Sequence, residues 1–316
     1  MRPRWSPARW LLIAVVVASV PFAARFLLRF PWGRTVDAIA DADWMLLAAA
    51  SLMNLVSLAF KGWAWHLLLR AWAPHRWRSA EAGTFVGAAV NAVSISVSGE
   101  AVRLERVARR DGVPLVAGAA SLVWARIIEA LALVVFLAVS LLWLPPGRWT
   151  VPAELVAWGI VVVMIVCIRL RVWTWLAERL PSRWRSRLTP AMPAGRLYLL
   201  APLSFSTANW FAQWLTYHWA IAATHVSTSP AVSLVALVAA NVGGILRLTP
   251  GNVGVLQFSL IFGMEAFHIP TDQALAAGLA LQAVQVLPVL LVGVGLVGVE
   301  GFRRRSAKRA ETVGAI

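Results

Sequence analysis

The sequence predicts an all-α protein embedded in a membrane, a polytopic transmembrane helical bundle with about seven full spans and two re-entrant or broken helices. First, 60% of its 316 residues are hydrophobic and 14% are charged, whereas soluble domains are roughly half apolar and a quarter charged. Second, many apolar runs approach or exceed the roughly 20 residues that a transmembrane helix needs. Third, Lys and Arg are distributed unevenly between the segments that separate these runs, as the positive-inside rule describes.

Nine apolar runs follow one another along the chain, at residues 10–28, 44–69, 82–97, 115–144, 155–170, 198–223, 231–248, 254–267 and 273–299. The first run follows a charged start, as in a signal peptide, but its apolar character continues to residue 28, and we expect an uncleaved span. The runs at 82–97 and 254–267 are short and adjoin polar breaks that contain glycine, so they are predicted to be re-entrant or broken helices. Asp41 and Asp43 stand just before Trp44 and are expected to cap the helix that starts there.

The charge distribution predicts the topology. The chain has 29 Lys and Arg against 14 Asp and Glu. With the N-terminus inside, 22 basic residues fall on the inner side and only Arg29, Arg34 and Arg148 on the outer side. We therefore expect a multi-pass protein of the plasma membrane with both termini cytoplasmic. One integral membrane domain would cover residues 1–302, followed by a basic cytoplasmic tail at 303–316. No separate basic domain remains, so nucleic-acid binding is not expected.

The first candidate site is Arg126 with Glu129, in the run that begins at Leu115. Arg126 lies about 16 Å along that helix, where a charge costs about 2.5–3.5 kcal/mol on the insertion scale. The two residues are three apart and share one helix face. Two interpretations stay open: a self-neutralising pair that fixes packing, or a guanidinium that exchanges its partner for an anionic group of a substrate.

The second candidate site is the segment from Asn91 to Arg103, which has serines at alternate positions. Such a pattern does not suit a lipid-facing helix, but it suits unwound backbone that lines a cavity. Glu100 and Arg103 are again three residues apart and can pair. The alternative is a plain turn at the membrane surface before a cytoplasmic helix.

The third candidate site is the break around Pro250 and Gly251. Proline removes a backbone donor and glycine permits close approach, and the amides at the start of the next helix could bind an anion such as phosphate. A simple hairpin turn between two spans is the alternative. Both short runs have a glycine break preceded by an asparagine, Asn91 or Asn241. This pattern is typical of an internal inverted repeat with its site at the repeat interface.

Other motifs argue against catalysis and cofactors. The sequence contains no Walker loop, no nucleophile elbow and no histidine spacing suited to a metal. An Asp-x-Asp pair occurs only as Asp41 and Asp43, which we expect to be a helix cap. We therefore expect no cofactor, no metal and no enzymatic activity. Lys61 is expected to extend toward the inner face of the membrane, with a role in a substrate pathway as the alternative.

Three segments carry a resemblance to a known family: Ser98-Gly-Glu-Ala-Val-Arg103, Arg126-Ile-Ile-Glu129 and Thr249-Pro-Gly-Asn-Val-Gly-Val-Leu-Gln257. The chain resembles the transmembrane region of lysylphosphatidylglycerol synthases, a flippase-like family. In that family the positions of Asn252 and Gln257 usually hold glycine and an acid, and the position of Glu129 more often holds aspartate. The resemblance implies an integral membrane protein of the lipid-translocating class. It does not imply aminoacyl transfer, which belongs to a separate soluble domain.

The expected function is translocation of an anionic, phosphate-bearing lipid or polyprenyl-phosphate-linked substrate between leaflets, with membrane lipids as the partners. One alternative is a membrane-embedded lipid-modifying transferase. Another is an accessory subunit of a glycosyltransferase or lipid-modifying enzyme. The residues expected to form a groove for the lipid phosphate are Ser98, Gly99, Glu100, Arg103, Arg126, Glu129, Arg247, Thr249, Pro250, Gly251, Asn252, Gly254 and Gln257.

Overall fold

The computed structural model describes residues 36–37, 40–94, 98–142, 199–244 and 252–314, together with isolated residues between 155 and 179. These residues are almost entirely helical, and none of them lies in a strand. Three helices in these ranges, Trp44–Leu69, Leu115–Phe136 and Thr271–Phe302, are long and apolar enough to cross a membrane. The prediction of an all-α membrane bundle is confirmed. The expected span at 10–28, and all but isolated residues of the one at 155–170, lie outside the described part.

The first half of the bundle consists of α3 (Trp44–Leu69), α4 (Trp77–Val93), α5 (Ser98–Asp111) and α6 (Leu115–Leu142). As predicted, Asp43 caps α3, because its carboxylate accepts hydrogen bonds from two amides of the first turn at 2.9 and 3.1 Å. Helices α4 and α5 form an antiparallel hairpin. At its tip the Gly99 amide donates to the Asn91 side chain at 2.9 Å, and at its base the Arg76 amide donates to the Asp111 carboxylate at 3.3 Å. The hairpin therefore begins and ends at the same end of the bundle.

The second half repeats this order with α10 (Leu200–Ala223), α11 (Pro230–Gly243), α12 (Val255–Glu265) and α13 (Thr271–Gly314). The run at 231–248, expected among the full spans, forms a helix of only 14 residues, about 21 Å long. It ends at Gly243 and packs against α12 in a second hairpin, where Gly263 lies against Ala239. At the end of the chain, α13 continues without a break at residue 302 as far as Gly314.

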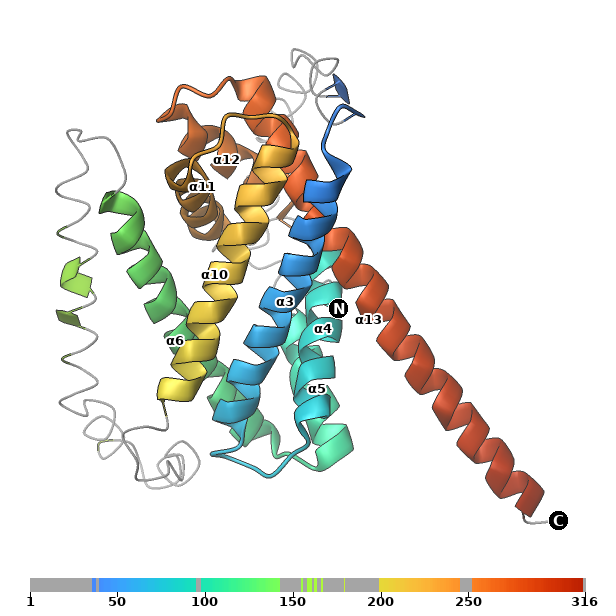
Figure 1. The fold of residues 1–316 in the computed structure, drawn as a ribbon. Coiled ribbons are helices and arrows are strands. Elements are labelled where there is room, and N and C mark those ends of the chain that lie inside the picture. Colours follow the sequence, from blue (N-terminus) through green and yellow to red (C-terminus); the bar gives the residue numbers. More distant parts are fainter. Residues whose placement is uncertain are drawn as a thin grey trace, which may run out of the picture.

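The two halves are inverted relative to each other. Figure 1 shows α3 and α10 side by side and antiparallel, with the α4–α5 hairpin toward one end of the bundle and α11–α12 toward the other. The Asp43 amide before α3 donates to the carbonyl of Ala223, at the end of α10, at 2.8 Å. Near the middle, Gln213 Nε2 donates to Ser57 Oγ at 2.5 Å, and these residues are 156 positions apart.

The spacing of 156 residues recurs in other contacts between the halves. On α3, Asn54 Nδ2 donates to the carbonyl of Gln285 on α13 at 3.3 Å. The residue 156 positions later, Trp210 on α10, donates through Nε1 to the carbonyl of Glu129 on α6 at 2.9 Å. The two acceptors, Glu129 and Gln285, are also 156 residues apart. The contact from Asn54 to Gln285 and the contact from Trp210 to Glu129 are therefore related by the inverted repeat. The described helices therefore form an inverted repeat, and Ser57 and Gln213, which contact each other, lie on its axis.

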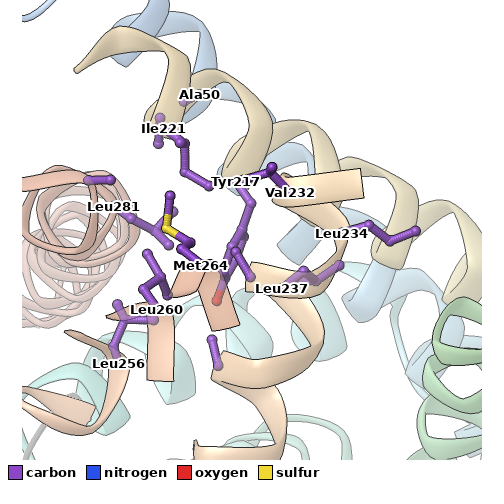
Figure 2. Close-up of a cluster of buried hydrophobic side chains, with 14 of the residues drawn as sticks. Ala50, Tyr217, Ile221, Val232, Leu234, Leu237, Leu256, Leu260, Met264 and Leu281 are labelled. Atoms are coloured by element: carbon purple, nitrogen blue, oxygen red, sulfur yellow. The ribbon is translucent and has the colours of Figure 1, made fainter. Parts of the chain in front are cut away.

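Apolar side chains hold each hairpin against its own half. In the second half a buried cluster includes residues from all four helices, as Figure 2 shows for Ile221 of α10, Leu237 of α11, Leu260 of α12 and Leu281 of α13. A second cluster in the first half is built around the fully buried Trp65 and includes residues of α3 to α6. Apolar contacts also join the halves, because Ala50 of α3 and Ala132 of α6 belong to the cluster of the second half.

Pro288 lies inside α13, opposite Asn54 on α3. Proline has no amide hydrogen to give to the carbonyl four residues earlier, that of Val284. Asn54 Nδ2 donates to this carbonyl at 3.2 Å, and Asn54 Oδ1 accepts from Gln213 Nε2 at 3.2 Å. A side chain of α3 therefore replaces the missing backbone hydrogen bond of α13, as helices in lipid require.

A histidine pair closes the turn between α3 and α4. His75 Nδ1 lies 3.0 Å from the carbonyl of Ala73, and His75 Nε2 lies 2.8 Å from His66 Nδ1. Burial, with a smaller contribution from Arg70, lowers the pKa of His75, whereas the Ala73 carbonyl and Asp111 oppose this shift. The network fits two neutral rings, with His75 donating to Ala73 and accepting from His66.

Candidate functional site

Five charged side chains from three helices of the first half form one continuous cluster. Glu129 pairs with Lys61 of α3 at 3.1 Å and with Arg126 at 2.9 Å. Arg126 also pairs with Glu100 of α5, which in turn binds Arg103 at 2.9 Å. Each carboxylate is thus held by two cations, and with all groups ionised the cluster carries three positive and two negative charges. Both pairs predicted from three-residue spacing are present, and Arg126 joins them.

Arg103 has unused donors. Its side chain is only 4% exposed, and its guanidinium lies 4.4 Å from the centre of the Trp65 ring. Nη1 donates to Glu100, but Nε and Nη2 meet no hydrogen-bond acceptor among the described residues. Glu81 of α4 interacts electrostatically with Arg103 at longer range, but the two make no ion pair within 4.0 Å among the described groups. Buried donors without an acceptor cost about 1–3 kcal/mol, so this site is suited to an added acceptor such as a phosphate oxygen.

Two adjoining cavities, of about 590 and 230 Å³, contact the cluster. Arg103 lines the smaller cavity and Glu129 the larger. The smaller cavity also lies where the two hairpins meet, because Ser94 at the end of α4 and Asn252 before α12 both line it. The residues common to both cavities are Leu58, Lys61, Glu100, Arg126, Asn252 and Gln285.

The charges belong to one half of the repeat only. Residues 156 positions after the five charged ones are Tyr217, Leu256, Ser259, Gln282 and Gln285. All five are uncharged at neutral pH, and Tyr217 is hydrogen-bonded to Gln285 just as Lys61 is bonded to Glu129. The larger cavity therefore has a charged wall from the first half and, among the described residues, an uncharged wall from the second.

Ser98 and Gly99, both expected at the phosphate groove, lie at the tip of the first hairpin and outside the described lining of both cavities. Ser98 Oγ is hydrogen-bonded to Ser94 Oγ. Gly99 faces the backbone of Gly87, and a side chain on either glycine would overlap the other helix. Their place in the structure is therefore the close contact of α4 with α5, which brings Glu100 and Arg103 to the cavity.

Four expected residues of the second break, Arg247, Thr249, Pro250 and Gly251, lie outside the described residues. Asn252 lines both cavities, and its φ of +57° is left-handed. Glycine adopts this conformation readily, and asparagine is among the few other residues that tolerate it. Asn252 can therefore keep the backbone of the glycine usual in the resembled family while adding an amide.

Gly254 and Gln257 form the N-terminal cap of α12. Gly254 has a φ of +84°, and its amide donates to Gln257 Oε1 at 2.7 Å. Gln257 is buried, its Nε2 lies 3.5 Å from the carbonyl of Gly278 on α13, and neither capping residue is among the described lining of the cavities. The glutamine that replaces the acid of the resembled family therefore serves local structure here.

Lys61 differs from its expected position. Instead of extending toward the membrane surface, its ammonium group binds Glu129 and lines both cavities. An ion pair with a buried carboxylate offsets the cost of desolvating both groups, and no local pattern on α3 could reveal a partner 68 residues away. The amides of Asn209 and Gln213, which line the larger cavity, were also not predicted, because they face the site only after the halves have packed together.

The comparison with known families agrees with this geometry. The family model described as "Lysylphosphatidylglycerol synthase TM region" matches residues 10–293 of the chain. No curated protein matches it. A match over this length covers the whole of both halves up to the middle of α13, including the charged cluster and both hairpins. The chain therefore belongs to the family of lysylphosphatidylglycerol synthase transmembrane regions, integral membrane proteins tied to lipid metabolism or transport.

Proposed function

We propose that the protein moves an anionic, phosphate-bearing lipid between the leaflets of the plasma membrane. The observation that carries this proposal is the cluster of three cations and two carboxylates that lines two adjoining cavities between the inverted halves. Charges within membrane-spanning segments are costly, and they commonly mark the pathway of a substrate or an ion. Over the two adjoining cavities together, the excess of one cation gives the lining a charge opposite to that of a phosphodiester.

The headgroup would bind by exchange of partners. Nε and Nη2 of Arg103 are free to donate to phosphate oxygens, and a planar guanidinium can bind two of them at once. Arg126 and Lys61 would complete the contact from α6 and α3. When no lipid is bound, Glu100 and Glu129 pair with these cations. These ion pairs would offset the desolvation of the charges until the next lipid binds. The acyl chains would stay in the surrounding lipid throughout.

The two hairpins supply the gates in this proposal. We infer that α4–α5 and α11–α12 are re-entrant, entering from opposite faces of the membrane and meeting near its middle. Because each re-entrant hairpin returns to its own side, it leaves the topology unchanged. The basic segments at 70–81 and 103–110 overlap the two ends of the first hairpin, which supports a cytoplasmic location of the hairpin and of both termini. Alternating access would then be a rocking of one half against the other.

We propose transport without chemistry on the lipid. The charged groups in the cavity are occupied with one another, and Glu100 and Glu129 are each held by two cations. A carboxylate in such a pair is a weak base, which does not suit it to activate a nucleophile. The direct partners are therefore membrane lipids, and purified protein should act without a glycosyltransferase or another enzyme.

The test is a translocation assay in vesicles. The full chain is reconstituted with fluorescent phosphatidylglycerol, and a membrane-impermeant quencher measures how fast label crosses between leaflets. We expect Arg126→Gln to lower the rate at least tenfold, because it removes the link between Glu100 and Glu129. Arg109→Gln is the matched control, since Arg109 is an exposed arginine of α5 that pairs only with Glu105 among the described groups. Equal rates for wild type and Arg126→Gln would exclude the proposed site, and no rate above empty vesicles would exclude the function.

A further inference from the structure

The uncharged wall of the larger cavity is rich in amides. Its second-half residues include Asn209, Gln213, Asn241 and Gln285, with Asn252 at the tip of the second hairpin. Tyr217 and Trp210 complete this wall as aromatic residues with polar tips. Amide groups each offer donors and an acceptor, a combination that matches hydroxyl groups better than it matches a charge.

Two of these amides are open to a ligand. Asn209 is 5% exposed and lines the larger cavity, yet its side chain has no hydrogen bond within the described structure. Asn252 lines both cavities and likewise has no hydrogen bond there. In contrast, Asn241 donates to the carbonyl of Leu237 in its own helix at 2.8 Å. A buried polar group normally has a partner, which applies to Asn209, and Asn252 is half-buried at the wall of both cavities. These two residues therefore indicate where neutral polar atoms of a headgroup would lie.

The second half also offers no carboxylate from its helices to pair with an ammonium group. The sequence has no Asp or Glu between residues 200 and 264 or between 273 and 299. The only carboxylates that line the described cavities are Glu100 and Glu129, and each already binds two cations. A cationic headgroup group would therefore lie beside a cluster with one excess positive charge and would be repelled by it.

We propose that the substrate is a phosphodiester lipid whose headgroup ends in an uncharged, hydroxyl-bearing group, such as a polyol or a sugar. The phosphate would bind at Arg103 and Arg126 in the first half, and the hydroxyl groups at the amides of Asn209 and Asn252 opposite. The two surfaces lie in two adjoining cavities: Arg103 lines the smaller cavity, Asn209 lines the larger one, and Arg126 and Asn252 line both. This inference rests on the proposed function, since it names the class of lipid that the same site takes.

The test measures lipid binding separately from transport. The full chain is placed in nanodiscs, and native mass spectrometry records which lipid it retains from equal mixtures. The glycerophospholipid arm contains phosphatidylglycerol, phosphatidylethanolamine, lysyl-phosphatidylglycerol and phosphatidic acid. A second arm replaces phosphatidylglycerol with a polyprenyl-phosphate monosaccharide, which distinguishes the two sources of the headgroup. We expect at least tenfold preference for the hydroxyl-bearing phosphodiester in one of the arms.

Two variants locate the selectivity. Asn209→Leu keeps the branched shape and the number of heavy atoms of the side chain but removes its amide. Asn252→Gly removes the other amide, and glycine adopts the left-handed backbone of this position without strain, so it provides a folded variant even where Asn209→Leu is unstable. Both should lower the preference over phosphatidic acid several-fold, with phosphatidic acid binding unchanged. Gln273→Leu is the control, because Gln273 is an exposed amide at the start of α13.

The outcomes separate this inference from the proposed function. Equal retention of phosphatidylethanolamine, lysyl-phosphatidylglycerol and phosphatidylglycerol by the wild type would overturn the headgroup class, even where vesicles show transport. Selectivity that Asn209→Leu and Asn252→Gly leave intact would overturn the assignment of the amide wall. Selective binding without transport in vesicles would support this inference and contradict only the proposed function.

Discussion

The contact between Asn54 and α13 predicts a measurable coupling with Pro288. Replacing Asn54 with alanine leaves the Val284 carbonyl without a partner, because Pro288 cannot supply one. An unsatisfied buried carbonyl costs about 1–3 kcal/mol, whereas hydrogen bonds measured between membrane helices average about 0.6 and reach about 1.7 kcal/mol. Since this carbonyl has no backbone amide to accept from in its own helix, we expect a coupling free energy near the upper value, about 1–1.5 kcal/mol.

The measurement is a double-mutant cycle on reversible unfolding in mixed micelles. Asn54→Ala alone should destabilise the protein by about 2 kcal/mol, because it also loses the contact with Gln213. In the Pro288→Ala background residue 288 has an amide that can bond to Val284, so the same substitution should cost about 1–1.5 kcal/mol less. A coupling of 1.4 kcal/mol corresponds to a tenfold difference in the unfolding equilibrium.

Ser57→Ala is the control for this cycle. Ser57 bonds to Gln213 and to the carbonyl of Asn54 but makes no hydrogen bond to α13 among the described residues, so its effect should be the same in both backgrounds. Effects of Asn54→Ala and Pro288→Ala that add within about 0.3 kcal/mol would refute the argument that α3 replaces the missing hydrogen bond of α13.

Three further predictions concern packing, an ion pair and pH. Gly293→Val should destabilise the protein by about 1–3 kcal/mol in the same assay, because the valine side chain would overlap α4. The control Gly298→Val places its side chain in open space and should change stability by less than about 0.5 kcal/mol. Equal effects of the two substitutions would contradict this packing. Glu300→Gln should cost about 0.5–1 kcal/mol, less at high salt, because Glu300 joins α13 to Arg106 of α5, and a cost that salt leaves unchanged would argue against an ion pair. The free energy of unfolding should fall as pH drops below the ordinary pKa of histidine, about 6.5. Below that pH the unfolded chain binds a proton at His75, whereas the folded state, with its lowered pKa, does not. The slope of unfolding free energy against pH between 7.5 and 5.5 should be smaller in His75→Gln, and an unchanged slope would count against this assignment.

Local patterns predicted the elements well. Apolar length marked α3, α6 and α13, and the cap at Asp43 and the hairpin tip near Gly99 could be read from residue type. The three-residue spacing of Arg126 and Glu129 was enough to predict their ion pair, since a helix fixes that geometry. The short helix α11 could not be distinguished from a span, because the apolar run continues past Gly243 and hydropathy does not register where a helix ends.

Contacts between the halves could not be predicted from sequence. Lys61 meets Glu129 across 68 residues, and nothing in the neighbourhood of either residue specifies the other. The repeat itself was suggested only by two asparagines and two glycine breaks. It becomes evident in paired contacts, such as those of Asn54 and Trp210, where unlike side chains make the same bond. Equivalent positions have kept their geometry while their chemistry diverged.

The confinement of all five charges to one half has a consequence for kinetics. With two identical inverted halves, a transported lipid would meet the same binding energies from either face of the membrane. In the proposed transport the two halves are not equivalent, since the described lining from the first half is charged and that from the second half is uncharged, so the states open to the two faces of the membrane should bind the lipid with different affinities. A passive carrier of this kind cannot create a gradient, by detailed balance. It can, however, saturate at low concentration on one face and at high concentration on the other, so forward and reverse fluxes would show unequal half-saturation.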